Sequence, residues 1–199
     1  MITYRSCVKS VLDRCVAITL VVLLMPLFVL VALVLMVSLR ELPLFFQERG
    51  GYRDTVFRVI KFKTMRSTDN FEADHDRMTK ASKFIRSISL DELPQLFNIL
   101  VGDMSIVGPR PLLAEYLGVY SESEKHRHDV RPGITGLAQI NGRNSLNWKD
   151  RFALDLYYVE NISFLLDLSI LAKTFVKVLS RESVNNGDNI TMEKYNGHN

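Results

Sequence analysis

The chain has 199 residues, enough for one domain with a hydrophobic core and one appended element. Its 25 lysines and arginines exceed its 22 acids by three, and the sequence contains no long basic run and no zinc-finger spacing. These features argue against a nucleic-acid-binding protein and favour an anionic surface or a phosphorylated ligand. The two cysteines, Cys7 and Cys15, do not make a disulfide framework, so we expect a reducing, cytoplasmic setting.

An uncharged, apolar segment occupies residues 16–39. As a helix, its 24 residues would be about 36 Å long, and the hydrocarbon core of a bilayer is about 30 Å thick. A cleaved signal peptide is not expected, because the run is too long and no small-residue cleavage pattern follows it. Length alone therefore predicts one membrane-spanning helix.

Two features of this segment favour a re-entrant helix, which enters the membrane and returns to the same face. Pro26 lies near the middle, where the missing N–H removes a helix bond and favours a bend. Both flanks are basic, and basic flanks prefer the cytoplasmic side. These cations are Arg5, Lys9 and Arg14 before the segment and Arg40, Arg49, Arg53, Arg58, Lys61 and Lys63 after it. Proline also occurs in ordinary spans, so both topologies stay open at this point.

The rest of the sequence predicts a helix-rich α/β domain. Strands are predicted over 44–49 and 56–62, joined by the turn-like GGYRD. Helices are predicted over 78–88, 91–100, 148–160 and 163–180, with two short ones between 111 and 130. Loops are predicted over 68–77, 102–111 and 131–147. We therefore expect a membrane-associated helix over 1–40, one domain over 41–180 and a polar tail, loosely ordered, over 181–199.

The stretch SISLDELPQL, residues 87–96, places two carboxylates side by side, Asp91 and Glu92. One structural explanation is a capping box, with Ser89 as the N-cap and Glu92 three positions later. Pro94 argues against it, because its missing N–H would then fall inside the helix. With Asp91 as the N-cap, Pro94 falls in the first turn and loses no bond. Capping alone would explain Asp91 but not the second acid, although acids are common in a first turn.

Basic residues in nearby motifs favour a phosphate-handling site around this acid pair. Arginine forks match phosphate oxygens in pairs, and carboxylates near phosphate repel it unless a divalent cation lies between them. Mg²⁺ takes one or two carboxylates together with phosphate oxygens. We therefore predict a Mg²⁺-assisted site for a diphosphate at the lipid interface. Its candidate cations are Lys61, Lys63, Arg86, Arg110 and Arg143.

The histidines of EKHRHD are weaker candidates for ligands. His126 and His128 are two residues apart, which places them on different sides of a helix. We expect surface histidines here rather than a metal site.

The order of the motifs resembles that of the small monotopic phosphoglycosyl transferases. The motifs cover the chain from Lys9 to about Ser180 and are the apolar helix with a central proline, FFQER, FKTMR, SLDELPQL, GDMSIVGPRP and RPGITGLAQINGRN. One departure is Met25-Pro26, because the family's bend is typically Ser-Pro. A serine hydroxyl can bond a backbone carbonyl that the proline leaves free, whereas methionine cannot. Through KHRHDVRPGITGLAQINGRN and EKYNG, the chain most resembles the bacillosamine-type enzymes.

This resemblance implies an enzyme that moves a sugar-1-phosphate from a UDP-sugar to undecaprenyl phosphate and releases UMP. It implies a ping-pong route through an aspartyl-phosphosugar, with Asp91 as nucleophile and Glu92 as a Mg²⁺-associated carboxylate. Arg110 and Arg143 carry over as phosphate or nucleotide contacts, and Lys61, Lys63 and Arg86 as weaker substrate contacts.

The resemblance also bears on the donor and the location. The bacillosamine-type likeness implies UDP-N,N'-diacetylbacillosamine or another UDP-acetamido sugar, while a UDP-hexose for capsule or O-antigen assembly stays open. The family's re-entrant helix implies a monotopic protein on the cytoplasmic face of the inner membrane, where its apolar helix would also allow a homodimer.

Two other functions stay open. A non-catalytic membrane-anchored interaction module would use SLDE as a cap and the basic residues to bind anionic lipid. A membrane-bound phosphatase would form the same aspartyl-phosphate but pass it to water. Turnover of a nucleotide sugar would distinguish a transferase from the interaction module. Dependence on lipid phosphate would distinguish it from the phosphatase.

Overall fold

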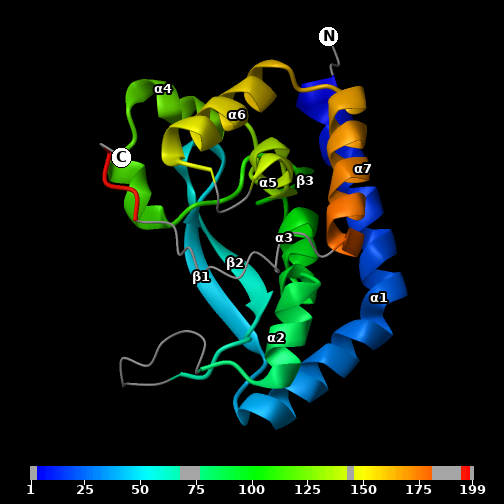
Figure 1. Ribbon diagram of the computed structural model, residues 1–199. Coiled ribbons are helices and arrows are strands. Elements are labelled where there is room, and N and C mark those ends of the chain that lie inside the picture. Colours follow the sequence, from blue (N-terminus) through cyan, green and yellow to red (C-terminus); the bar gives the residue numbers. More distant parts are fainter. Residues whose placement is uncertain (1–3, 68–76, 143–145, 181–193, 198–199) are drawn as a thin grey trace.

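The computed structural model describes residues 4–67, 77–142, 146–180 and 194–197 (Figure 1). The helices are α1 Lys9–Leu39, α2 Lys80–Ser87, α3 Gln95–Val101, α4 Glu122–Lys125, α5 Leu137–Asn141, α6 Trp148–Glu160 and α7 Phe164–Ser180. The strands are β1 Leu44–Gly50, β2 Val56–Phe62, β3 Ser105–Val107 and β4 Gly133–Thr135. Short helical turns are η1 Tyr4–Val8, η2 Tyr52–Asp54, η3 Leu90–Glu92, η4 Ala114–Gly118 and η5 His126–Asp129.

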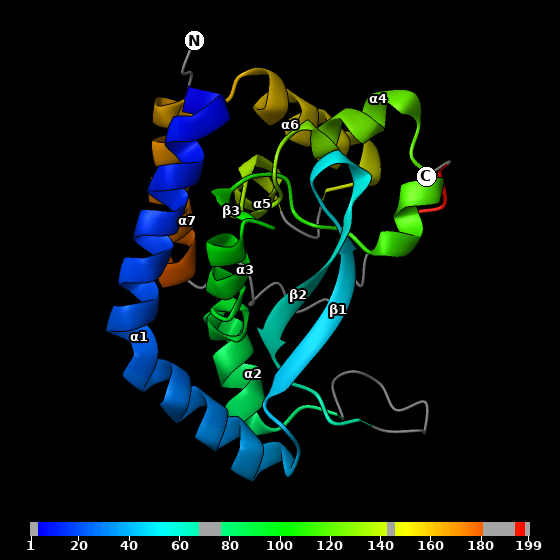
Figure 2. The same ribbon diagram turned by 180° about the vertical axis from the view of Figure 1, so that it is seen from behind.

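The long helix α1 bends partway along its length, as both side views show (Figures 1 and 2). Pro26 lies inside it, where the lost backbone bond favours a bend. The helix is long and apolar enough to cross a membrane, and only 22% of its most apolar 18-residue window is buried. A core helix of a soluble protein would bury most of such a window, so this exposed apolar surface favours membrane association.

The main core lies between three layers: α1, the α2–α3 pair and the β1–β2 hairpin (Figure 1). Buried residues recur at helical spacing along one face of α1, and this face packs against the other two layers. The antiparallel hairpin matches the predicted strands, with Leu44 opposite Phe62 and Gly50 opposite Val56. From β2, Val59 and Phe62 enter the core, and from α3, Leu96 and Ile99 do so. The layer order places α3 between the membrane-associated helix and the hairpin.

A second, parallel sheet forms where loops were predicted. Strands β3 and β4 pair through Ser105 with Gly133 and Val107 with Thr135. Each strand has only three residues and lies beside glycine or proline, so the sequence carries too little strand pattern to reveal it. A Cβ added at Gly133 would lie 2.1 Å from the Gly108 nitrogen, so the two backbones can approach only because glycine is present. Helix α5 also forms inside the predicted loop 131–147.

The chain end returns to the domain. Residues 194–197 lie in the segment predicted to be a loosely ordered tail, yet the Tyr195 side chain is buried. Its ring packs against Trp148 and Phe152, and its hydroxyl donates to Glu124 at 2.7 Å. Here the sequence prediction is wrong, because a single aromatic residue in a polar stretch has no periodicity to mark it. The rest of the predicted tail lies outside the described residues.

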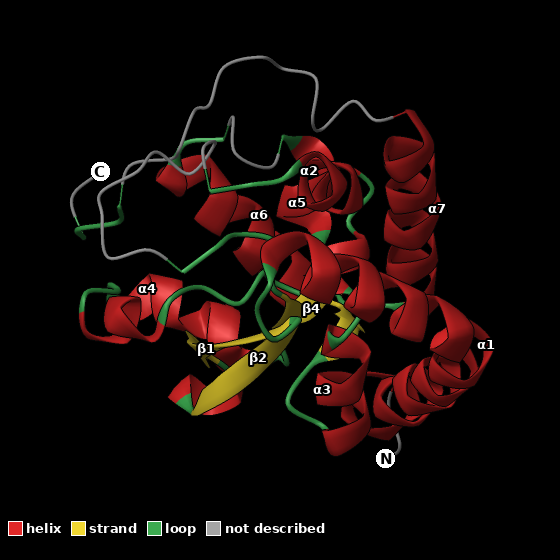
Figure 3. Ribbon diagram, turned by 90° about the horizontal axis from the view of Figure 1, so that it is seen from below, coloured by secondary structure: helices red, strands yellow, loops and turns green. Residues whose placement is uncertain are grey.

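Helices α1 and α7 lie together on one side of the molecule (Figure 3). Asp167, in the first turn of α7, accepts hydrogen bonds from the Lys9 ammonium at 2.6 Å and the Tyr4 hydroxyl at 2.6 Å. Its other carboxylate oxygen accepts from the Tyr158 hydroxyl at 2.7 Å. Lys9 was predicted to be a basic flank of the membrane segment, but it is buried here and fixes α1 to the domain.

Candidate active site

Asp91 and Glu92 lie in η3, a single 3₁₀ turn that joins α2 to α3. Ser89, just before it, has a φ of 58°, a left-handed conformation that costs a non-glycine residue about 1–2 kcal/mol. Ser89 makes no side-chain capping bond, and α3 begins only at Gln95, with Pro94 as its N-cap. Both capping explanations are therefore wrong: neither Ser89 nor Asp91 caps α3, and the acid pair is free for another role.

The amide of Asn98 holds α3, the helix that follows this turn, against strand β2. Its Oδ1 accepts from the Ile60 N–H at 3.0 Å, and its Nδ2 donates to the Arg58 carbonyl at 2.8 Å. Asn98 is itself buried in the middle of α3. Because strand side chains alternate, Lys61 lies on the same side of β2 as Val59 and reaches the acid pair that precedes α3.

Glu92 is tied to two cations. Its Oε1 accepts from the Lys61 ammonium at 2.9 Å and from the Arg110 guanidinium at 2.8 Å. Burial alone would raise the pKa of Glu92, but Arg110 and Lys61 outweigh it and hold that pKa well below its ordinary value. Glu92 is therefore ionised throughout the neutral range and fixes the two cations.

Asp91 has a different environment. In the described part of the chain, no lysine or arginine forms an ion pair with it, although its side chain is half-buried. Burial, and then the neighbouring charge of Glu92, raise the pKa of Asp91 to about 6, against the opposing effects of Lys61 and Arg86. Two adjacent acids thus have pKa values moved in opposite directions, which is typical of a pair with divided chemical roles.

A third cation, Arg49 of β1, completes the cluster. Arg49, Lys61 and Arg110 line a small cavity of about 10 Å³ beside Gln95. Burial and the nearby charge of Arg110 lower the pKa of Arg49 to about 10. Lys61 and Arg110 are thus bonded to Glu92, with Arg49 beside them, and three cations against the two carboxylates leave a surplus positive charge that suits an anion such as phosphate. The cavity holds only a water-sized group, so it marks where the cations converge rather than room for a nucleotide sugar.

Two of the other predicted substrate contacts, Lys63 and Arg86, have neither a hydrogen bond nor an ion pair to Glu92 among the described residues. The Lys63 ammonium binds Glu41 and donates to Ser67 Oγ at 2.6 Å. Arg86 lies 3.6 Å from the Met65 sulfur and lowers the Asp91 pKa through its charge. Arg143 lies outside the described residues, so its role stays a prediction.

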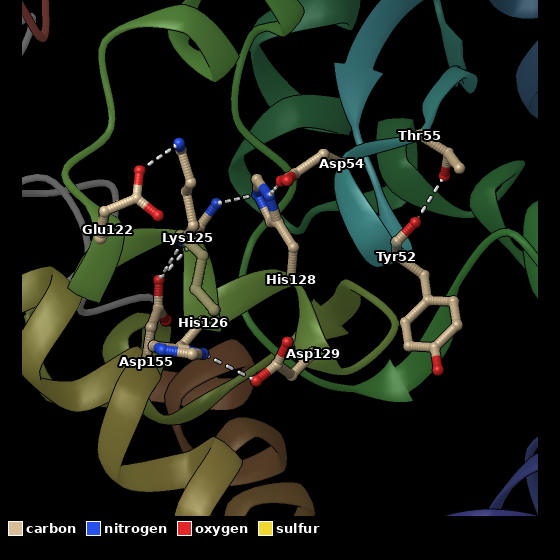
Figure 4. Close-up of polar contacts among 10 residues, drawn as sticks. Tyr52, Asp54, Thr55, Glu122, Lys125, His126, His128, Asp129 and Asp155 are labelled. Carbon is tan, nitrogen blue, oxygen red and sulfur yellow. Dashed lines mark hydrogen bonds and ion pairs between the residues drawn. The ribbon is translucent and has the colours of Figure 1, made fainter.

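The two histidines have unlike environments (Figure 4). His126 is exposed and pairs with Asp129 at 3.0 Å. His128 is buried, contrary to the expectation of surface histidines, because η5 turns that side of the segment into the domain. Its Nδ1 contacts Asp54 and its Nε2 lies 3.3 Å from Arg127. Within the part of the chain that the structure describes, neither histidine belongs to a group of three or more His, Cys, Asp or Glu side chains.

The described residues do not by themselves form a metal cage. Among the residues that the structure describes, no three His, Cys, Asp or Glu side chains gather in one place. Asp91 and Glu92 supply two carboxylates, the number that Mg²⁺ takes when substrate phosphate completes its coordination. Asp91 also has no ion-pair partner among the described residues, so the pair fits a cation that arrives with a diphosphate.

A larger cavity, about 490 Å³, lies beside the start of α1. Its lining includes neither Asp91 nor Glu92 but does include Arg5, Lys9, Asp13, Tyr52, Arg53 and Arg131. Size alone would favour it as a substrate site. The acid pair is nevertheless the stronger candidate site, because the paired carboxylates with divided pKa values lie there.

Sequence reasoning missed two residues of the site, Arg49 and Arg127. Arg49 ends the FFQER motif and appeared only as a flanking charge, and Arg127 stands between the two histidines. Both are far from Arg110 in the sequence, and only the fold brings them into contact with the loop at residues 109–111 that contains Arg110. No local pattern distinguishes them from surface arginines.

Comparisons with known proteins point to a single family. Residues 4–181 match the profile described as Bacterial sugar transferase. An uncharacterized sugar transferase, EpsL of Bacillus subtilis, is 49% identical over 160 residues, covering 78% of this chain and 79% of that protein. The exopolysaccharide production protein ExoY of Sinorhizobium fredii is 37% identical over 198 residues, covering 88% and 87%. The UDP-glucose:undecaprenyl-phosphate glucose-1-phosphate transferase of Caulobacter vibrioides is 35% identical over 189 residues, covering 88% and 71%.

Proposed function

Because the chain belongs to the bacterial sugar transferase family, we propose that it transfers a sugar-1-phosphate from a UDP-sugar to undecaprenyl phosphate and releases UMP. The observation that carries the proposal is the unequal acid pair. Glu92 is held ionised by Lys61 and Arg110, whereas Asp91 has no ion-pair partner in the described chain and a raised pKa. A carboxylate with a pKa of about 6 is ionised at neutral pH and more basic than an ordinary aspartate, which favours it as a nucleophile.

The proposed reaction has two displacements at one phosphorus atom. First, an Asp91 carboxylate oxygen attacks the β-phosphorus of the UDP-sugar, and the bond from that phosphorus to the bridging oxygen breaks, so that UMP leaves. In the second step, an oxygen of undecaprenyl phosphate attacks the same phosphorus, and the bond to Asp91 breaks. The products are the lipid diphosphate sugar and the regenerated carboxylate, which gives ping-pong kinetics.

The cations support both steps by stabilising charge on the transferring phosphoryl group. Lys61 and Arg110 are fixed by Glu92, and Arg49 adds a third charge beside them. Asp91 and Glu92 are the residues that would hold Mg²⁺, which neutralises diphosphate charge when bound. Arg143, and more weakly Lys63 and Arg86, remain proposed contacts to the nucleotide or its phosphates.

For the donor, we propose a UDP-acetamido sugar such as UDP-N,N'-diacetylbacillosamine. This choice rests on the likeness of KHRHDVRPGITGLAQINGRN and EKYNG to the bacillosamine-type enzymes. The Caulobacter relative is named for glucose, so a UDP-hexose is the competing donor. The product would serve as the first lipid-linked intermediate of a glycoprotein, O-antigen or capsule.

The experiment measures UMP release from a panel of UDP-sugars in the presence of Mg²⁺, with and without undecaprenyl phosphate. Sustained release is expected only with the lipid, and Asp91→Asn should abolish it while expression and membrane association persist. An Asp91→Asn variant that turns over freely would overturn the proposal. Sustained release without lipid would instead indicate a phosphatase, and no release from any donor would indicate an interaction module.

We also propose that α1 is re-entrant and holds the domain on the cytoplasmic face of the inner membrane. The bend in α1, its Pro26 and its two basic flanks support this topology. In a Cys7→Ser, Cys15→Ser background, single cysteines at Thr3 and at Glu122, which is exposed, would be labelled from one side only. Labelling from opposite sides would show a membrane-spanning helix instead.

A further inference from the structure

Arg127 is a fully buried arginine whose side chain contacts the Pro-Arg-Pro loop, residues 109–111. Its side chain is 1% exposed, and it belongs to η5. Burial works against its charge, but Asp155 outweighs burial and raises the pKa of Arg127. A buried charge of this kind is costly unless its hydrogen bonds are met, so its contacts show what it holds.

The first of these contacts is to the backbone of Arg110. The Arg127 Nη2 donates to the Arg110 carbonyl oxygen at 2.7 Å. The neighbouring carbonyls of the same loop are also held, that of Pro109 by the Gly133 N–H at 2.9 Å and that of Pro111 by Arg49 Nη1 at 3.3 Å. Two of the three residues are prolines with no N–H, so the loop depends on donors from elsewhere for its conformation.

The remaining contacts fix Arg127 itself. Its Nε and Nη2 both donate to Asp155 Oδ2, at 3.1 and 2.8 Å, and Asp155 lies on α6 with its side chain 2% exposed. Its Nη1 lies 3.3 Å from His128 Nε2, while His128 Nδ1 contacts Asp54 on the hairpin turn (Figure 4). The guanidinium of Arg127, a residue of η5, thus connects α6 to the Pro-Arg-Pro loop. A lysine, with a single nitrogen, cannot make all of these contacts at once.

We propose that Arg127 is a positioning residue that sets the Arg110 guanidinium on Glu92 by holding the Arg110 carbonyl, with Asp155 and His128 fixing Arg127 in turn. The inference deepens the proposed function, on which it rests, since Arg110 is the proposed phosphate contact. Loss of this support would let the loop shift, and a misplacement of about 1 Å at a reacting group can cost about 100-fold in rate. Arg127 does not touch the substrate.

The test is a double-mutant cycle between Arg127 and Arg110. In the wild-type background, Arg127→Lys should lower kcat/KM about 10- to 100-fold. In an Arg110→Ala background, the same change should cost less than about 3-fold, because Arg127 acts through a side chain that is no longer present. Equal losses in both backgrounds would show a general structural role and overturn the proposal.

A matched control is available in a second buried ion pair, between Lys9 of α1 and Asp167 of α7. Asp167→Asn breaks the buried contact to Lys9, whose side chain is 8% exposed, in a cluster that does not touch Arg110. It should lower the melting temperature while changing kcat/KM of the folded enzyme less than about 2-fold. If Arg127→Lys does not fold, Asp155→Asn removes the same support from α6 and takes its place in the cycle.

A second cycle needs no substrate and therefore separates the two proposals. Melting temperatures are measured for Arg127→Lys, Glu92→Gln and the double variant in the same detergent. If Arg127 sets Arg110 on Glu92, the loss in the double variant should be smaller than the sum of the single losses. Additive losses would overturn the positioning role. If the two losses in melting temperature are coupled but the protein turns over no UDP-sugar, the positioning role stands and the proposed function is rejected.

Discussion

Two clusters of this protein each hold a carboxylate with hydrogen-bond donors from other elements, but they differ in whether any acid is left without an ion-pair partner. In the anchor cluster, Asp167 accepts hydrogen bonds from Tyr4, Lys9 and Tyr158, so both of its oxygens are occupied. Burial and Asp167 raise the pKa of Tyr158, which keeps its hydroxyl a donor. In the site cluster, Glu92 is similarly held by two cations, but Asp91 beside it has no ion-pair partner in the described chain.

The difference teaches how to distinguish a structural acid from a reactive one. A buried carboxylate whose oxygens are all bonded stabilises the fold, and its removal exposes a buried partner. A carboxylate that is half-buried and lacks an ion-pair partner has a raised pKa and retains its lone pairs for a reaction. The contrast predicts opposite results for mutations in the two clusters.

The largest effect is expected from Asp167→Asn. It removes the nearer counter-charge of the buried Lys9 ammonium and leaves Asp13 at 3.5 Å, so we expect the low end of the about 3–5 kcal/mol that breaking a buried pair costs. Thermal or denaturant unfolding in detergent should show this loss, while UMP release per folded molecule persists. Retained stability together with lost turnover would reverse the assignment of the two clusters.

A smaller effect, of about 100-fold in kcat, is expected from Glu92→Gln. The change removes the charge that fixes Lys61 and Arg110, so the cations are no longer pre-organised for the phosphoryl group. Steady-state UMP release measures it. Glu48→Gln is the matched control, because Glu48 pairs with Arg58 at an exposed site of the hairpin, and its kcat should stay within 2-fold of the wild type.

The raised pKa of Asp91 predicts a pH-dependent stability in metal-free buffer. Because the folded-state pKa of about 6 exceeds the ordinary 3.8, the folded state binds the extra proton, and this stabilisation is lost as pH rises through 6. Asp91→Asn removes the effect. In EDTA, the free energy of unfolding of the Asp91→Asn variant should therefore exceed that of the wild type by an amount that grows between pH 4 and pH 7. This difference should reach at most about 3 kcal/mol.

Denaturant unfolding at each pH measures this difference, with Glu122→Gln on the exposed surface as control. A difference that shrinks as pH rises would mean that Asp91 has an ion-pair partner in the folded state.

The smallest effect is expected from Lys63→Ala. Lys63 binds Glu41 and Ser67 rather than Glu92 and is only a weaker proposed substrate contact, so its loss should lower kcat/KM by no more than about 3-fold. Lys61→Ala, two residues earlier on the same strand, should cost about 10-fold or more, because Lys61 contacts Glu92 directly. Equal losses at the two positions would indicate that Lys63 turns to the substrate when it binds.

Much of the fold follows from local patterns. The hairpin, α6 and α7 were predicted within about a residue or two, because each repeats at the period of its own element. The parallel strands β3 and β4 and the short α5 were not, since three to five residues beside glycine carry no period. Prediction of the 91–100 helix was wrong at its start, because the left-handed Ser89 and the 3₁₀ turn delay α3 to Gln95.

The sequence by itself determined the adjacent acids, the apolar helix and the basic motifs, since each is a property of neighbouring residues. Only the tertiary structure decided which cations meet Glu92, because Lys61 and Arg110 come from a strand and a loop on either side of it in the chain. The same holds for Lys9 and Arg127, whose charges read as surface features until the fold buries them. Burial and long-range contacts set the pKa of a carboxylate, and neither is encoded in its immediate neighbours.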